Sequence, residues 1–340
     1  MISTLSPEKI KAVLEDTNRQ NIEQLAVTAR RLTRQYFGRA IGLYTPLYLS
    51  NFCSSHCTYC GFHRQHAITR RKLTPVEMHL EMQAISKLGT QNILLLTGES
   101  PQATPLEYLV TAISIAKEYF QGIGLEIFPL SEEGYRKLYQ AGADSLTLYQ
   151  ETYDRDCYKT VHLAGEKQDY MFRRQAPERA AKAGLRQISL GVLLGLGPLA
   201  EDLFHLYEHV QELEKNFPGI EYSLSFPRLR TIKTKEFASA CIDDTTFVKI
   251  LCLTRLVFPR AGINLSTRET AALRNRLLDI CVTRVSIGSK TGVGGYAADE
   301  PSSDPQFDIA DDRSASELIQ HLKDHAFDPV FTDWRKIENF

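Results

Sequence analysis

Long apolar runs are absent from this 340-residue sequence, and the N-terminal segment lacks the apolar core of a secretory signal. No stretch is long and apolar enough to suggest a membrane span. An excess of charge of either sign is also absent, since 40 lysines and arginines face 41 aspartates and glutamates. This balance gives no reason to expect nucleic acid or a membrane surface as the main partner. We therefore expect a cytoplasmic protein.

Disulfides are not expected either, because the cytoplasm keeps thiols reduced. Three of the seven cysteines form a C-x3-C-x2-C array at Cys53, Cys57 and Cys60. Cysteines this close together in a chain without a secretory signal indicate a metal site. The other four are scattered, and we expect them to be free thiols: Cys157, Cys241, Cys252 and Cys281.

The cysteine array directly follows an apolar, aromatic run that is typical of a buried strand. A four-iron cluster usually takes four cysteine ligands, so three cysteines leave one iron open. An open coordination position is typical of a reactive metal site rather than a structural one. Two other interpretations stay open, namely three unrelated core thiols or a zinc site. The zinc site would take its fourth ligand from one of three histidines: His56, His63 or His66.

From Gly42 onward, short apolar segments alternate with amphipathic ones, which predicts βαβ units and a parallel sheet. Eight segments are predicted strands: Leu43–Ser50, Asn92–Thr97, Gly124–Phe128, Ser145–Glu151, Gln187–Leu194, Glu221–Phe226, Ile263–Ser266 and Val282–Ile287. Seven segments between them are predicted helices: Thr74–Leu88, Pro105–Phe120, Ser131–Ala141, Tyr170–Ala183, Glu201–Phe217, Thr245–Phe258 and Thr270–Asp279. The pattern predicts an α/β fold, a (β/α)8 barrel of the TIM type. An incomplete barrel is the alternative, because the last two strand candidates are weak.

Three regions are expected along the chain. Residues 1–40 form an N-terminal helical extension, with Ser6 as the cap of its first helix. Residues 41–300 form the barrel, and residues 301–340 form a loop-rich tail that packs on it. The tail is acidic and contains one helix candidate, Ser314–Asp324. It lies on the surface or folds over the mouth of the barrel.

In such a barrel, the chemistry lies at the C-terminal ends of the strands. The second predicted strand ends in Thr97-Gly98-Glu99. The glycine permits a sharp turn or the close approach of a ligand, and the carboxylate can bind an ammonium group. Without the cysteines, this tripeptide would be an ordinary turn.

The fourth predicted strand ends at Glu151, where an unpaired buried carboxylate would be costly. We expect it to contact a bound cofactor or to form an ion pair with a cation such as Lys167 or Arg173. Glycines interrupt the fifth strand, including Gly191. They mark close backbone approach to a ligand or serve packing.

Arginines gather at the ends of the sixth and seventh strands, at Arg228, Arg230 and Arg268. Arginine binds a carboxylate through two parallel hydrogen bonds, so this rim indicates an anionic ligand. The alternative is a set of rim ion pairs with Glu269 and the acidic tail. Near the end of the eighth strand, Ser286 adds a hydroxyl group.

The spacing of the cysteine array is the signature of the radical S-adenosylmethionine (SAM) enzymes, and the chain resembles them. Within that group it is most similar to the tyrosine lyases of thiamine thiazole synthesis, the 2-iminoacetate synthase family. Six strings carry this resemblance: Pro46–Asn51, Leu96–Glu99, Tyr149–Tyr153, Ser225–Arg230, Leu265–Glu269 and Gly294–Tyr296. The resemblance runs from about Arg30 to Trp334 and so covers nearly the whole chain.

The resemblance implies two cofactors, a [4Fe-4S] cluster and SAM. The cluster would be held by Cys53, Cys57 and Cys60, and the amino and carboxylate groups of SAM would fill the open iron. The implied contacts to SAM are Tyr59, Thr97, Gly98, Glu99, Glu151, Arg173 and Gly191.

The implied reaction cleaves the Cα–Cβ bond of L-tyrosine to 2-iminoacetate and p-cresol. Arg268 is our first choice for the substrate carboxylate and Ser286 is a second donor, with Arg230 and Arg228 as alternatives. The implied partners are a reduced flavodoxin or ferredoxin and a thiazole synthase. The basic stretch His63–Lys72 either docks an acidic electron donor or forms a solvated loop.

Close relatives with other functions share these strings. The tyrosine lyase of hydrogenase cofactor maturation carries a second cysteine cluster in a C-terminal domain, whereas no cysteine follows Cys281 here. A tryptophan-processing relative uses the same barrel. The remaining alternative is a non-catalytic, zinc-stabilised barrel.

Overall fold

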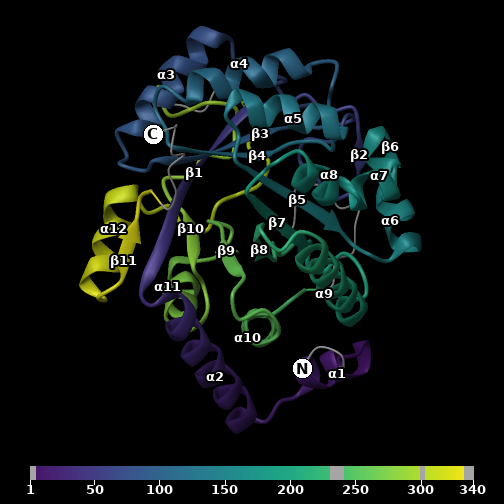
Figure 1. Ribbon diagram of the computed structural model, residues 1–340, viewed down its shortest axis with the longest axis vertical. Helices are drawn as coiled ribbons and strands as arrows, with labels where there is room; N and C mark the ends of the chain where they lie inside the picture. The colour runs from purple at the N-terminus through teal and green to yellow at the C-terminus, as the bar shows by residue number, and fades with distance from the viewer. Residues whose placement is uncertain (1–4, 230–240, 299–302, 333–340) are drawn as a thin grey trace.

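The computed structural model describes residues 5–229, 241–298 and 303–332. Its centre is a closed barrel of eight parallel strands, surrounded by helices (Figure 1). All eight predicted strands are present: β1 (Ala40–Ser50), β3 (Asn92–Thr97), β4 (Gly122–Glu126), β5 (Ser145–Glu151), β7 (Gln187–Val192), β8 (Glu221–Ser225), β9 (Gly262–Leu265) and β10 (Arg284–Ser286). The prediction of a TIM-type barrel is therefore confirmed.

Pairing between the first and last barrel strands closes the sheet. Strand β1 pairs in parallel with β10, in a register that joins Leu43 to Val285 and Tyr44 to Ser286. The incomplete barrel is thus wrong, although β10 has only three residues. A short strand suffices here because parallel partners on both sides, β9 and β1, hold it in place.

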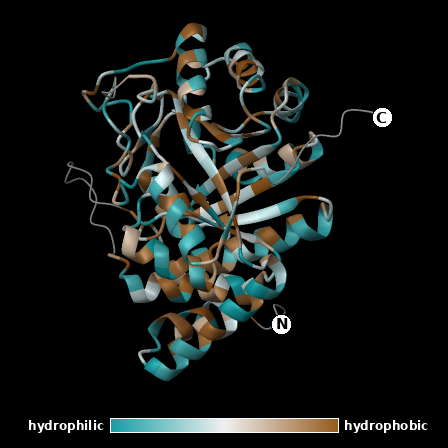
Figure 2. Ribbon diagram, turned by 90° about the vertical axis from the view of Figure 1, so that its left-hand side faces the viewer, coloured by the Kyte–Doolittle hydropathy of each residue, from teal (hydrophilic) through white to brown (hydrophobic). Residues whose placement is uncertain are grey.

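The helices form the outer layer and bury their apolar sides against the barrel. Figure 2 shows apolar positions where the helices meet the sheet and polar positions on their outward sides. The principal outer helices are α3 (Pro75–Ser86), α4 (Leu106–Ala116), α5 (Glu132–Ala141), α8 (Ala176–Lys182), α9 (Leu199–Asn216), α10 (Asp244–Val257) and α11 (Ala271–Ile280). In the described part of the chain, no helix is both long and apolar enough to cross a membrane.

One predicted helix is divided in two. The segment expected to be helical from residue 170 to 183 forms α7 (Tyr170–Arg174) and α8, with Gln175 between them. Pro177 occupies the first turn of α8. Proline has no N–H group to continue a helical hydrogen-bond ladder, so the chain starts a new helix there. The break matters because α7 carries Arg173.

The N-terminal extension forms two helices, α1 (Pro7–Glu15) and α2 (Arg19–Phe37), and the side chain of Ser6 caps the first as predicted. A buried lysine of α10 ties the extension to the barrel, because Lys249 Nζ donates hydrogen bonds of 2.7 Å and 2.6 Å to the carbonyls of Leu14 and Asp16. The three region boundaries stay a prediction.

The described part of the tail contacts the barrel at two places. After α12 (Ala315–Asp324), strand β11 (Asp328–Val330) pairs with the start of β1. At the opposite end of the barrel, residues 303–311 lie across the mouth. There, Gln306 N donates to Thr291 O over 2.9 Å, and Ala310 N donates to Thr267 O over 2.8 Å. Of the two expectations for the tail, the one that folds it over the mouth is the observed one.

Candidate active site

The cysteine loop is held in place by its own hydrogen bonds. The buried Asn51 donates through Nδ2 to Thr69 O over 2.8 Å. The guanidinium of Arg70 donates to the carbonyls of Asn51, Phe62 and His63 over 2.6, 2.8 and 2.7 Å. The loop is therefore shaped by protein contacts. Since Arg70 is used in this way, part of the predicted basic docking stretch serves the loop itself.

Short elements from a distant part of the chain brace the middle of the loop. Strand β2 (His56–Cys57) pairs antiparallel with β6 (His162–Ala164), which follows α6 (Arg155–Val161). Next to this pair, Tyr59 Oη lies 2.8 Å from His162 Nε2, and His162 Nδ1 lies 2.8 Å from Tyr158 O. Burial, with the nearby Lys167 and Arg173, lowers the pKa of His162 to about 2. The ring is therefore neutral, so its Nδ1–H donates to the carbonyl and Nε2 accepts from Tyr59.

The three cysteines of the array line one cavity of about 650 Å³. Burial raises the pKa of Cys53 to about 11 and raises those of Cys57 and Cys60 as well. Among the described residues, no three His, Cys, Asp or Glu side chains are grouped so that they could hold one metal ion. A structural zinc site gathers its ligands around a single ion, whereas cysteines that ligate a cluster bind separate irons. The donor set fits a cluster better than zinc.

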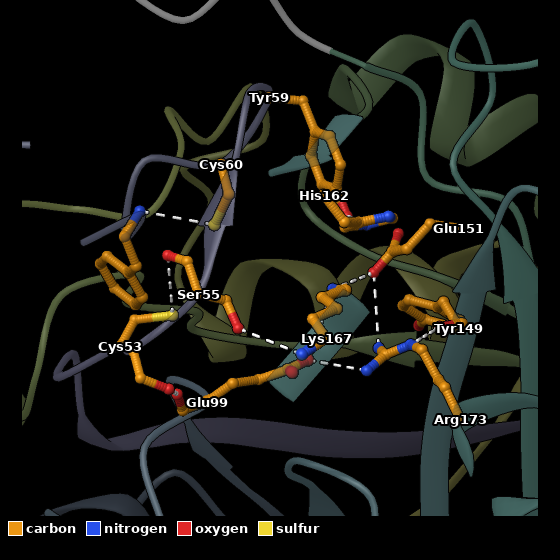
Figure 3. A network of polar contacts seen from close by, with 12 residues as sticks. Cys53, Ser55, Tyr59, Cys60, Glu99, Tyr149, Glu151, His162, Lys167 and Arg173 are labelled. Atoms are coloured by element: carbon orange, nitrogen blue, oxygen red, sulfur yellow. Dashed lines mark hydrogen bonds and ion pairs between the residues drawn. The ribbon is translucent and has the colours of Figure 1, made fainter. Parts of the chain in front are cut away.

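Two carboxylates and two cations form a buried network beside this cavity (Figure 3). Lys167 Nζ lies 2.7 Å from Glu151 Oε1 and 3.5 Å from Glu99 Oε1. Arg173 Nη1 lies 2.7 Å from Glu99 Oε1, and its Nη2 lies 3.6 Å from Glu151 Oε1. Burial alone would raise the pKa of Glu99, but Arg173 and Lys167 outweigh it and lower that pKa. The Glu99 carboxylate is thus held ionised inside the barrel.

The second barrel strand leaves two acceptors free toward the same cavity. Glu99 Oε2 and Thr97 Oγ1 are buried without a hydrogen-bond partner in the described chain, and both residues line the cysteine cavity. Between them, a Cβ on Gly98 would lie 2.3 Å from Phe52 O, so only glycine lets this strand end approach the cysteine loop. A buried acceptor without a partner is costly unless a ligand supplies a donor. These groups fit the amino group expected for SAM.

The backbone at Glu151 adopts an unusual conformation. Its φ is 73°, in the left-handed region that favours glycine, and the pairing of β5 with β7 shifts register between Tyr149 and Glu151. Such an irregularity redirects a side chain at the end of a strand, and strained residues gather at functional sites. The expected ion pairs of Glu151 with Lys167 and Arg173 are confirmed. Glu151 also lines the cysteine cavity, and its contact with a cofactor stays a prediction.

A second cavity of about 1050 Å³, open at its mouth, continues from the first. Arg268 and Ser286 both line it. The guanidinium of Arg268 lies 3.5 Å from the centroid of the Phe307 ring. Ser286 Oγ is buried and makes no well-directed hydrogen bond to the described chain. Eight residues line both cavities: Tyr48, Cys60, Leu96, Glu126, Tyr149, Glu151, Lys167 and Gln306.

Two of the predicted residues that the structure describes do not line these cavities, and a third cannot be placed. Arg230 lies outside the described residues. Arg228 forms ion pairs with Glu269 and, over 2.8 Å, with Asp244, which is the rim alternative weighed above. Gly191 is not among the lining residues, and a Cβ there would lie 2.0 Å from Ser225 O, so close packing explains the glycine. A contact between Gly191 and the cofactor stays a prediction.

Sequence reasoning missed several lining residues. Glu126 ends β4 just as Glu151 ends β5, so the rule applied to Glu151 would have found it. Gln306 and Phe307 come from the tail, and no pattern in the sequence marked them as residues of the site. Gln306 accepts a 2.7 Å hydrogen bond from Tyr48 Oη, and its Nε2 lies 3.9 Å from Cys60 Sγ.

Comparisons with known proteins agree with this geometry. Residues 47–210 match the family model of the Radical SAM superfamily, and residues 225–328 match that of the Biotin and Thiamin Synthesis associated domain. The chain is 37% identical over 331 residues to the 2-iminoacetate synthase of Salmonella typhimurium, covering 97% of this chain and 88% of the relative. It is 37% identical to the Escherichia coli enzyme of the same name, covering 98% and 88%.

A solved structure shares the fold over nearly the full chain. The crystal structure of HydG, a maturase of the [FeFe]-hydrogenase, superposes with a TM-score of 0.90 at 30% identity. The match covers 97% of this chain and 73% of HydG.

Proposed function

Because the chain belongs to the 2-iminoacetate synthase family of radical SAM enzymes, we propose that it cleaves the Cα–Cβ bond of L-tyrosine to 2-iminoacetate and p-cresol. The 2-iminoacetate serves the thiazole moiety of thiamine. The observation that carries this proposal is the continuity of the two cavities, one lined by the cysteines and Glu99, the other by Arg268 and Ser286.

The cysteine cavity is lined by the three cysteines and by most of the residues expected to contact SAM. Cys53, Cys57 and Cys60 hold the [4Fe-4S] cluster, and Glu99 Oε2 with Thr97 Oγ1 accept hydrogen bonds from the amino group of SAM. When bound, the cluster and SAM supply the 5′-deoxyadenosyl radical that takes a hydrogen atom from the substrate.

The substrate cavity must bind an amino acid and exclude water. Arg268 binds the substrate carboxylate through its fork of N–H donors, and Ser286 Oγ donates a further hydrogen bond. Gln306 and Phe307 cover the site from the tail, which keeps water and stray hydrogen donors from the radical. Holding the substrate in one orientation supplies much of the rate enhancement that such a site can give.

The proposed reaction requires two protein partners and a reducing compartment. The cluster needs an external one-electron donor of the flavodoxin or ferredoxin type. The imine product hydrolyses readily in water, so a thiazole synthase that captures it is the second partner. All seven cysteines are free thiols, which agrees with a reducing compartment, and we place the enzyme in the cytoplasm.

Anaerobic incubation of the cluster-loaded enzyme with SAM, a reductant and L-tyrosine tests the function. With L-tyrosine we expect p-cresol and 5′-deoxyadenosine in equal amounts. With L-tryptophan we expect only a background level of 5′-deoxyadenosine. Turnover of tryptophan without p-cresol from tyrosine would favour the tryptophan-processing alternative. Stoichiometric zinc without acid-labile sulfide would instead identify a non-catalytic barrel.

A further inference from the structure

Glu126 is a carboxylate at the junction of the two cavities. It is the last residue of β4 and lines both cavities, with part of its surface open to them. Within the described chain, no ion pair within 4.0 Å and no hydrogen bond engages its side chain. The nearby carboxylates Glu99 and Glu151 both have such partners. Unlike these two carboxylates, Glu126 is therefore available to bind a ligand that enters the cavity.

We propose that Glu126 binds the amino group of the amino-acid substrate, so that Glu126 and Arg268 together recognise the two charged groups of one zwitterion. This inference rests on the proposed function, since it assigns a second anchor for that substrate.

The charges around Glu126 support a position facing Arg268. Arg268 is the charged group that acts on it most strongly, followed by Glu151, Lys167 and Arg173. The α-amino and α-carboxylate groups of an amino acid lie close together, so their receptors must be near each other without touching. Glu126 meets this condition, because Arg268 acts on it electrostatically yet no ion pair within 4.0 Å is formed with it.

Burial of Glu126 favours the binding of a cation beside it. Burial raises the pKa of Glu126 to about 7, an effect that Arg268 only partly offsets and that Glu151 reinforces. Burying an ionised carboxylate without a counter-charge is costly. A bound ammonium group supplies that counter-charge, so binding of the substrate and ionisation of Glu126 favour each other.

The amino group of SAM is the other cation that enters this region, but it has its own receptor. Glu99 lines only the cysteine cavity, whereas Glu126 also lines the cavity that holds Arg268. Glu126 is thus placed for the amine of the molecule that Arg268 binds.

Glu126→Gln tests the inference, because it keeps the shape and removes the charge. The readout is equilibrium dialysis against anaerobic, cluster-loaded enzyme with SAM and no reductant, so that binding is measured without turnover. The ligands are L-tyrosine and 3-(4-hydroxyphenyl)propionate, which lacks only the amino group. We expect the affinity for tyrosine to fall about 10- to 100-fold, the range for a hydrogen bond to a charged group. The affinity for the propionate should change less than about 3-fold, which is less than the loss of one such hydrogen bond would cause.

Two further variants make the result decisive. Glu214→Gln alters another partly buried carboxylate, on α9 and away from both cavities, and should leave both affinities unchanged. Glu126→Asp keeps the charge and should bind tyrosine more tightly than Glu126→Gln does. Equal losses for tyrosine and the propionate, or no loss for tyrosine, would overturn the inference. The product assay on the wild-type enzyme tests the proposed function separately, so either can fail without the other.

Discussion

Arg173 Nη1 donates a 2.7 Å hydrogen bond to one oxygen of Glu99, while the other oxygen of the same carboxylate is buried without a partner among the residues that the structure describes. The ion pair keeps the carboxylate charged inside the barrel, and the second oxygen keeps its full capacity as an acceptor. A site arranged in this way is prepared for a cation before the ligand arrives.

Glu99→Gln should weaken SAM binding about 10- to 100-fold, because an amide cannot supply the charge that an ammonium group needs. Iron and sulfide content should stay at the wild-type level, since Glu99 is not a cluster ligand. Equilibrium dialysis of SAM measures the change, and the exposed Glu133→Gln serves as control. Unaltered SAM affinity would remove Glu99 from the cofactor site.

Replacing any one of Cys53, Cys57 and Cys60 with alanine should abolish SAM cleavage, because each cysteine is expected to ligate a different iron. Iron and acid-labile sulfide analysis after anaerobic purification provides the measurement. The exposed Cys241→Ala should retain the cluster. A variant of the array that stays fully active would refute the ligand set.

Arg268→Ala should weaken L-tyrosine binding about 100-fold, as expected for a lost bidentate, charge-assisted contact. SAM affinity should change little, because Arg268 lines the second cavity and not the one that the cysteines share. Dialysis with each ligand gives both affinities. Arg276→Ala, on the exposed side of α11, is the matched control. Equal losses for both ligands would make Arg268 a SAM contact.

Asp311→Asn should lower the free energy of unfolding by about 3–5 kcal/mol, because it leaves a buried arginine without its counter-charge. Asp311 is 2% exposed and pairs with Arg274, which is 1% exposed. The measurement is urea unfolding of the cluster-free protein. Asp312→Asn changes an exposed neighbour and should have almost no effect. A loss no larger than that of the control would show that the tail does not depend on this ion pair.

His209 should make stability fall in acid. It is buried on α9 with Nδ1 2.8 Å from Tyr153 Oη, and burial, with Arg174 nearby, lowers its pKa to about 3. In the unfolded chain the pKa of this histidine is near its ordinary value of 6.5, so the stability present above pH 6.5 is lost as pH falls toward 3. Between pH 8 and pH 5, the wild type should lose about 2 kcal/mol more than His209→Gln.

Urea midpoints at the two pH values provide this comparison. The exposed His205→Gln on the same helix should follow the wild type. Parallel pH curves for the wild type and His209→Gln would contradict the assignment.

Much of the fold was predictable because its signals are local. All eight strands were found from short apolar runs, whose spacing depends only on neighbouring residues. Where a signal depended on one residue inside a longer pattern, as at Pro177 in the divided helix, the prediction was less accurate. Glu126 was missed, although its place at the end of a strand carried the same signal as Glu151.

The sequence alone determined that three cysteines follow the first strand and that polar groups end the strands around the barrel, because spacing along the chain and strand polarity fix both. Only the tertiary structure decided which of these groups meet. Arg228 pairs with Glu269, whereas Arg268 lines the cavity. Gln306 contacts Tyr48 and Cys60. The two contacts of Gln306 join residues more than 240 positions apart, and their formation depends on closure of the barrel rather than on any local pattern.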